Sequence, residues 1–202
     1  AINLIGAKNL ETLNLMQTNT NNIILPPLEI DGEPNFTSLR NLNISNTDIK
    51  NLNFNGVVKN YLDLTNFTDF QIIRASNNLS LTEVRANNIE SKPIRLESQC
   101  FYNCNNLTRI KGNYQIVGTE VFKHCSAFKI NDESTYETSL PFEFLEGDDV
   151  TNISINTSSL RGVFENSGIS YNDFKKVVYQ FNNNIVDIEG IFKGCYGIDG
   201  SL

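Results

Sequence analysis

Leucine and isoleucine recur in the N-terminal half of the chain at the spacing LxxLxL. The two clearest copies are NLETLNLMQT, from Asn9, and SLRNLNISNT, from Ser38. Weaker copies, NYLDLTN and SLTEVRANN, begin at Asn60 and Ser80. Alternation of apolar and polar residues with a period of two predicts a short, half-buried β-strand in each copy.

The second apolar position of each copy gives a register along the chain. Its members are Leu13, Leu42, Leu62, Val84 and Ile110. The intervals between successive members lie near the range of about 20–29 residues that is typical of leucine-rich repeats. The long first interval contains a stretch rich in Pro and Gly between Pro26 and Pro34, which predicts an inserted loop.

A different phrase recurs in the C-terminal half: a phenylalanine followed three residues later by Cys, Leu or Ser. Its five copies begin at Phe101, Phe122, Phe142, Phe164 and Phe192. This FxxC phrase is the strongest pattern in the sequence, because five copies at similar intervals indicate a repeated structural unit.

These residues carry a family resemblance. The segment SQCFYNCNNLTRIKGNYQIVGTEVFKHCSAFKI resembles the BspA-like leucine-rich repeats of bacterial surface proteins, which read approximately IGxxAFxxCxxLxxI. The tail NIVDIEGIFKGCYGIDGSL is similar to the related repeat NVxxMxxMFxGCxxLxGxL. The resemblance covers residues 81–202 well and 9–78 loosely, where the repeats look like more ordinary leucine-rich repeats. The copies at Phe142 and Phe164 lack the cysteine, and residues 131–149 match poorly.

We therefore expect a single domain over residues 1–202, a β-rich, right-handed leucine-rich-repeat solenoid. Short parallel strands would form one face, with irregular or short helical returns, and the chain would be a fragment of a larger protein. Residues 1–90 would hold the LxxLxL-type repeats and residues 91–202 the FxxC repeats. Because one repeat cannot bury its own apolar face, neighbours should stack in register. The register positions would form one interior ladder, the FxxC phenylalanines another, and a third would contain Leu15, Ile44, Leu64 and Ala86.

Composition and charge narrow the possible partners. The 202 residues include 31 Asn, which favours tight turns. The net charge is −7, and no basic stripe is present, so we expect no nucleic-acid partner. No apolar run reaches the length of a membrane-spanning helix, so we expect no membrane insertion. No secretory signal is visible in the first ten residues.

The positions of the cysteines in the repeat favour a role in core packing over metal binding. Three of the four occupy the position that Leu145 and Ser167 fill in other copies, which indicates a small buried slot. A zinc site would have to use the less usual ligand set Cys100, Cys104, His124 and Cys125. The sequence leaves open whether Cys104 and Cys125 form a disulfide.

Candidate catalytic groups are sparse. His124, the only histidine, stands at a variable repeat position and lacks an orienting partner in the sequence. We therefore expect no enzyme activity and no cofactor. The acidic run 146–149, with Asp132 and Glu133, could supply oxygen ligands for Ca²⁺ but lacks the alternating spacing of a calcium loop.

Residues between the leucines of each LxxLxL strand should point outward. They form a central column of Asn14, Asn43, Asp63, Arg85 and Lys111. The adjacent column contains Thr12, Asn41, Tyr61, Glu83 and Arg109. Tyr61, Arg85 and Arg109 are the best candidates for a binding hot spot, because Tyr and Arg dominate interface energetics. An ordinary solvated strand face fits the same pattern equally well.

The sequence as a whole predicts a non-catalytic recognition module that binds a protein or cell-surface ligand by its strand face. The resemblance implies adhesion at an extracellular or cell-surface location. An alternative is a structural repeat domain of a larger assembly, such as a phage virion or surface layer, whose partners would be other chains of that assembly.

Overall fold

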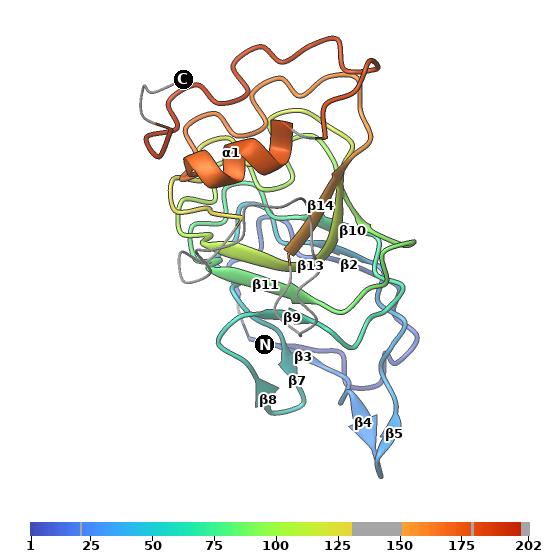
Figure 1. Cartoon of the computed structure of the whole chain (residues 1–202). Helices are drawn as coiled ribbons and strands as arrows, with labels where there is room; N and C mark the ends of the chain where they lie inside the picture. Colours follow the sequence, from blue (N-terminus) through green and yellow to red (C-terminus); the bar gives the residue numbers. More distant parts are fainter. Residues whose placement is uncertain (21, 131–150, 179, 199–202) are drawn as a thin grey trace.

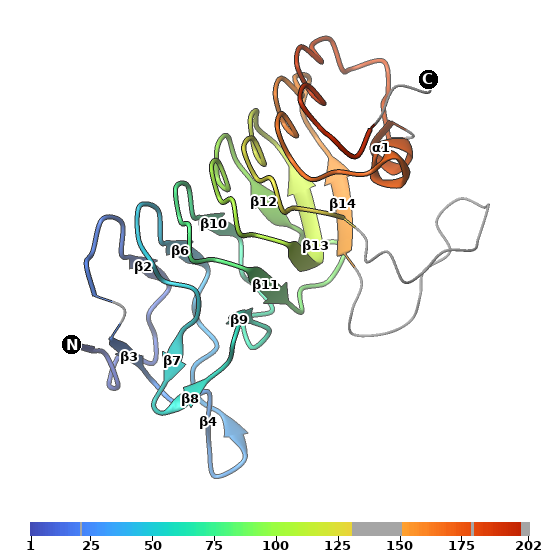
Figure 2. The same ribbon diagram turned by 90° about the vertical axis from the view of Figure 1, so that its left-hand side faces the viewer.

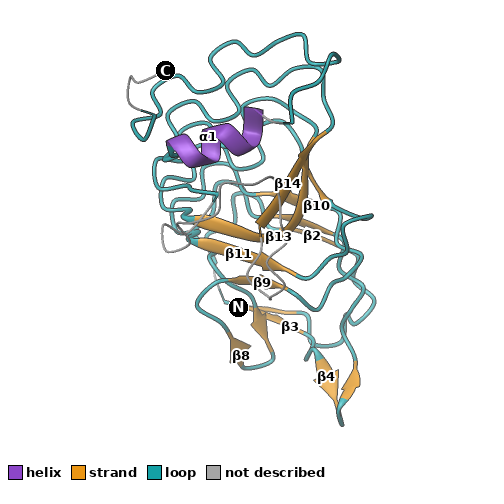
Figure 3. Cartoon of the chain, viewed as in Figure 1, coloured by secondary structure: helices purple, strands orange, loops and turns teal. Residues whose placement is uncertain are grey.

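The computed structural model describes residues 1–20, 22–130, 151–178 and 180–198. Short strands joined by long loops account for most of these residues, with one helix, α1 (Tyr171–Val178) (Figure 3). The chain winds repeatedly around a common core, and each circuit, here called a coil, stacks on the preceding one from the N-terminus onward (Figure 2). The fold is thus strand-rich and solenoid-like.

The largest parallel array, here called the long sheet, follows this stacking. Its strands, in spatial order, are β2 (Thr12–Asn14), β6 (Asn41–Asn43), β10 (Ile72–Arg74), β12 (Ile94–Leu96), β13 (Arg109–Ile116) and β14 (Thr151–Ile155). All neighbours in this array pair in parallel. Each strand therefore lies on the corresponding segment of the previous coil.

A second parallel array, the short sheet, contains β9 (Leu62–Leu64), β11 (Glu83–Ala86) and the first residues of β13. Strand β13 belongs to both arrays, so the sheet curls around the core (Figure 1). The change of direction falls at Gly112, whose φ of 121° suits glycine. A Cβ there would lie 3.1 Å from both Cβ and O of Ala86. Glycine thus permits both the turn and the close packing.

Two smaller arrays complete the N-terminal part. One contains β1 (Ile2–Asn3), β3 (Ile23–Leu25), β7 (Asn53–Phe54) and β8 (Val57–Val58). The other is the hairpin of β4 (Glu29–Ile30) and β5 (Glu33–Pro34), which lies in the inserted loop expected from the sequence. Asp31 and Gly32 connect its strands at φ values of 54° and 81°, as a tight hairpin turn requires.

The predicted interior ladder of LxxLxL positions is wrong as a single column. Leu42 is aligned with Leu13 and Ile73 in the long sheet, whereas Leu62 is aligned with Val84 in the short sheet. The step from Leu42 to Leu62 thus covers only part of a coil. The column of Leu15, Ile44, Leu64 and Ala86 divides in the same way, with Leu64 and Ala86 aligned in the short sheet.

The phenylalanine ladder is confirmed for its described members, although Phe164 follows Phe122 directly, where the sequence predicted Phe142 between them. The rings of Phe101 and Phe122, and of Phe122 and Phe164, stack with centroids 5.6 Å apart, and Phe192 follows at 5.9 Å. Their planes lie within 6° of one another. Phe142 lies outside the described residues. The FxxC repeat therefore builds a continuous aromatic column inside the stack.

Helix α1 packs near the C-terminal end of this column (Figure 1). Its N-terminus forms a capping box, because Ser170 N–H donates to Asp173 Oδ2 at 3.1 Å and Asp173 N–H donates to Ser170 Oγ at 3.3 Å. The Phe174 ring meets Phe192 edge-on at 4.8 Å. The helix thus adds an apolar cover to the last phenylalanine of the column.

Candidate functional site

The short sheet brings together Tyr61, Glu83, Arg85 and Arg109, here called the strand-face cluster. Strand β11 carries Glu83 and Arg85, β13 carries Arg109, and Tyr61 precedes β9 directly. Glu83 is aligned with Arg109, and Arg85 with Asp63. Parallel alignment places such residues on one face of neighbouring strands. The expected grouping of Tyr61 with the two arginines is therefore present.

The cluster is held by direct contacts. The Arg85 guanidinium carbon lies 4.0 Å from the centroid of the Tyr61 ring, a cation–π geometry. Arg85 Nε also donates to Glu83 Oε1 at 2.6 Å, and Arg109 Nη2 donates to Glu83 Oε2 at 3.2 Å. The side chain of Glu83 is only 12% exposed, against 31% for Arg85 and 39% for Arg109. One carboxylate thus fixes both arginines while they stay accessible.

The charge of Glu83 follows from its surroundings. Burial raises the pKa of this carboxyl, but the hydrogen bonds and positive charges of Arg85 and Arg109 outweigh burial and leave the pKa below its ordinary value. Glu83 is therefore ionised at neutral pH. The ionised form is the one that accepts both arginine hydrogen bonds.

Besides Glu83, two more residues of the expected outward columns are buried. Asp63 and Lys111 are each only 7% exposed. Asp63 Oδ1 accepts hydrogen bonds from Thr65 N at 3.0 Å and Thr65 Oγ1 at 2.6 Å, so it stabilises the turn after β9. Alternation along a strand predicts which way a side chain points relative to the core, but not what covers its outer end.

Asn14 and Asn43 lie apart from the cluster, because their strands belong to the long sheet. Asn14 Oδ1 accepts from Met16 N at 3.1 Å, and Asn43 Oδ1 accepts from Ser45 N at 3.0 Å. Both are Asx turns, in which the side chain satisfies the backbone two residues on. Thr12 and Asn41, also in the long sheet, bond to each other at 3.2 Å. The expected columns thus joined residues of two sheets.

The cysteines confirm the expected buried slot. All four are buried and free, so Cys104 and Cys125 form no disulfide. Cys104 Sγ donates to Ala75 O at 3.0 Å, Cys125 Sγ to Phe101 O at 2.9 Å, and Cys195 Sγ to a carbonyl of its preceding coil at 2.8 Å. Burial raises the pKa of the Cys125 thiol well above its ordinary value. These thiols act as core hydrogen-bond donors.

The other candidate ligand groups have structural partners or lie elsewhere. A ring nitrogen of His124 lies 3.2 Å from Asn166 Nδ2, and its ring meets Tyr102 edge-on at 5.5 Å. Among the described residues, no three His, Cys, Asp or Glu side chains form a group that could hold a metal ion. The acidic run 146–149, with Asp132 and Glu133, lies outside the described residues.

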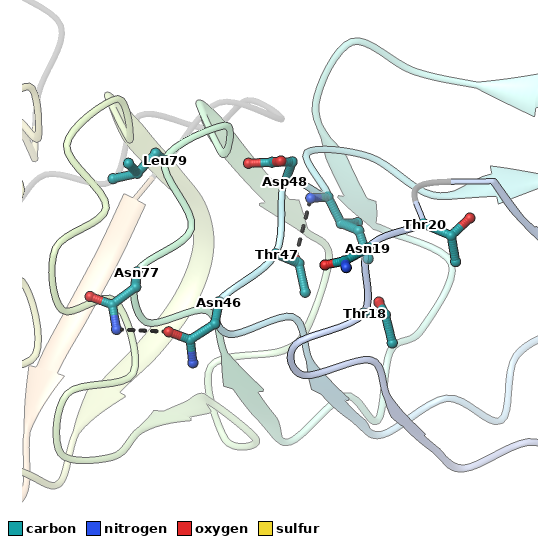
Figure 4. Close-up of a pocket in the computed structure, with 9 residues that line it drawn as sticks. Thr18, Asn19, Thr20, Asn46, Thr47, Asp48, Asn77 and Leu79 are labelled. Carbon is teal, nitrogen blue, oxygen red and sulfur yellow. Dashed lines mark hydrogen bonds between the residues drawn. The ribbon is translucent and has the colours of Figure 1, made fainter.

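A second candidate site, here called the turn groove, was not anticipated from the sequence. It has a volume of about 520 Å³ and lies where three successive coils leave the long sheet (Figure 4). Its lining comes from residues 18–20 after β2, residues 46–49 after β6, and Asn77 and Leu79 after β10. The only sequence signal is a polar pair, such as Gln17–Thr18 or Asn46–Thr47, that follows each strand closely.

No family model, curated protein or solved structure matches this chain. Within the described ranges, no helix combines the length and apolar character needed to cross a membrane. The geometry of the strand-face cluster and the turn groove is therefore the basis for a functional interpretation.

Proposed function

We propose that the chain is a leucine-rich-repeat solenoid that serves as a non-catalytic recognition module, and that the strand-face cluster binds a protein ligand. The buried LxxLxL leucines and the stacked phenylalanines support the repeat assignment. The resemblance to repeats of bacterial surface proteins supports an adhesive role outside the cell or on its surface. Repeat solenoids commonly offer a strand face as an extended binding surface.

The observation that carries this proposal is the contact between Arg85, Tyr61 and Glu83. An arginine stacked on a tyrosine ring and bonded to a carboxylate has already lost much of its rotamer freedom. Binding then costs less conformational entropy than it would at a mobile side chain. Tyr and Arg are also the residue types that contribute most at protein interfaces.

The chemistry of the described residues supports recognition rather than catalysis. A nucleophilic cysteine needs a low pKa and access to solvent. Cys100, Cys125 and Cys195 are buried, and burial raises the pKa of each thiol. The proposal accordingly includes no reaction and no cofactor.

The test measures the binding of the wild type and of two arginine variants to an array of purified extracellular and cell-surface proteins. The two arginines belong to different sheets. Arg85→Ala removes a member of the cluster, and Arg95→Ala removes an exposed arginine of the long sheet as a matched control. We expect wild type to bind at least one protein, Arg85→Ala to raise its Kd by about 10-fold or more, and Arg95→Ala to change it by less than about 3-fold.

Thermal unfolding followed by circular dichroism checks that both variants are folded. Equal effects of the two substitutions, or no binding to any protein of the array by the wild type, would contradict the proposal.

A further inference from the structure

We infer that the turn groove is a binding site for a neutral, hydroxyl-rich ligand, a short oligosaccharide. Its volume of about 520 Å³ falls in the range of small-molecule sites. Three successive coils contribute to it, so it is built from several loops rather than from one (Figure 4). Neighbouring strands lie about 4.8 Å apart, a spacing comparable to the width of one sugar ring.

The lining selects the ligand class. Among the residues that line the groove, amide and hydroxyl side chains predominate, with one carboxylate, Asp48, and two aliphatic residues, Ile49 and Leu79. None is Lys, Arg or His, so the groove offers an anion no positive side chain. With a net charge of −7, the chain also repels polyanions. The sparse apolar area is too small for a lipid chain.

A sugar offers hydroxyl groups to the polar lining and an apolar C–H face to the aliphatic residues. A hydroxyl both donates and accepts hydrogen bonds, and so does the amide of an asparagine, while a carboxylate accepts. Leu79, which is 48% exposed, supplies an apolar contact for the C–H face of a sugar ring. Small-molecule sites are usually lined mainly by apolar side chains, so this mostly polar lining favours a ligand that is itself rich in hydroxyl groups.

Hydrogen bonds made by its own lining residues preorganise the groove. Thr18 Oγ1 donates to Leu15 O at 2.8 Å, and Thr47 Oγ1 donates to Ile44 O at 2.7 Å, so both threonines hold the backbone in place. Asn77 Nδ2 donates to Asn46 Oδ1 at 3.1 Å. This bond restrains the orientation of the Asn46 amide.

The repeat offers a matched control for the key asparagine. Asn46 and Asn103 both adopt left-handed backbone conformations, with φ values of 55° and 58°, and both bond to Asn77. Only Asn46 lines the groove. Replacement of either by glycine keeps the left-handed backbone and removes one side-chain bond to Asn77: Asn46 Oδ1 accepts from Asn77 Nδ2, whereas Asn103 Nδ2 donates to Asn77 Oδ1. Because each variant loses one bond to Asn77, the difference in ligand affinity between them reports on the Asn46 side chain itself.

The experiment measures binding of maltotriose, cellotriose and triacetylchitotriose by saturation-transfer NMR and calorimetry. We expect wild type to bind at least one of them with a Kd of about 10 mM or tighter. Asn46→Gly and Asp48→Ala should each weaken this binding by about 5-fold or more, whereas Asn103→Gly should change it by less than about 2-fold.

Absence of binding by all three trisaccharides would overturn the inference, and so would equal losses from Asn46→Gly and Asn103→Gly. Arg85→Ala should leave saccharide binding unchanged, because the strand-face cluster belongs to the other sheet. The outcome is thus independent of the proposed protein-binding function.

Discussion

At the scale of single residues, asparagine does two structural jobs in this chain. At strand ends, as at Asn14 and Asn43, its carbonyl accepts a backbone N–H two residues on. In the loops between strands, a column of left-handed positions, with φ values between 54° and 62°, is occupied by Gln17, Asn46, Asn77, Asn103, His124 and Asn166. Asn tolerates this conformation better than most residues. The high asparagine content thus reflects the number of turns.

This column predicts a difference between two substitutions at Asn103. Both Asn103→Ala and Asn103→Gly remove the 3.0 Å bond to Asn77, but only alanine places a Cβ in the left-handed region. We expect the alanine variant to be less stable than the glycine variant by about 1 kcal/mol. Urea unfolding measures both free energies, and a more stable alanine variant would contradict the assignment.

At the scale of elements, the phenylalanine column and the LxxLxL strands could be predicted from the sequence. Strands β10 and β12 of the long sheet could not. The strands expected at LxxLxL all form, including those of the two weaker copies. Strands β10 and β12 were not recognised, since IIR and IRL are too short to establish a period against background. The coils that contain β10 and β12 consequently have more strands than the repeat count indicates.

The phenylalanine column predicts that its fully buried members contribute more to the free energy of unfolding than its partly buried members. Phe122 is fully buried and stacks on Phe101, Phe128 and Phe164. Phe122→Ala should therefore lower the free energy of unfolding by about 3–5 kcal/mol. Phe192→Ala, at a partly buried position of the same column, should cost clearly less. Denaturant titration of both variants tests this, and equal costs would argue against a continuous column.

The ion pairs of Lys123, one within a coil and one between coils, predict how stability depends on pH. Lys123 Nζ lies 2.8 Å from Glu120 Oε1 and 3.0 Å from Glu165 Oε2. The hydrogen bond from Lys123 is the main cause that holds the pKa of each carboxyl below its ordinary value, and the bonds to these carboxylates raise the pKa of Lys123 to about 12.

The pairs should thus stabilise the fold above the ordinary glutamate pKa and lose that effect as pH falls through the lowered values. At the alkaline end, the stabilisation is complete below the ordinary lysine pKa of 10.5 and is lost as pH rises through about 12. Lys123→Met should reduce the loss of unfolding free energy that accompanies the fall of pH through the acid range, called here the acid limb. The reduction should be under about 1 kcal/mol for each pair. Lys92→Met, which removes an exposed pair with Asp69, serves as the control and should alter this limb less.

At the scale of the whole molecule, the sequence predicted a stacked, strand-rich coil but assigned its strands to one face. By repeat spacing alone, Leu42 and Leu62 are successive members of the LxxLxL register, because the interval between them is a normal repeat length. The structure instead aligns Leu42 with Ile73, a longer step along the chain. Two hairpins and β9 lengthen these early coils, and spacing cannot distinguish a short repeat from part of a long one. The strand-face cluster therefore occupies its own sheet, separate from Asn14 and Asn43.

Pairs of introduced cysteines test this two-sheet arrangement most directly. Asn43 and Arg74 are aligned on adjacent strands of the long sheet, at a separation suited to a disulfide, whereas Asn43 and Asp63 belong to different sheets. Mild oxidation followed by non-reducing peptide mass spectrometry should detect the crosslink in Asn43→Cys/Arg74→Cys and none in Asn43→Cys/Asp63→Cys. The reverse result would restore the single column and contradict the fold on which both proposed sites depend.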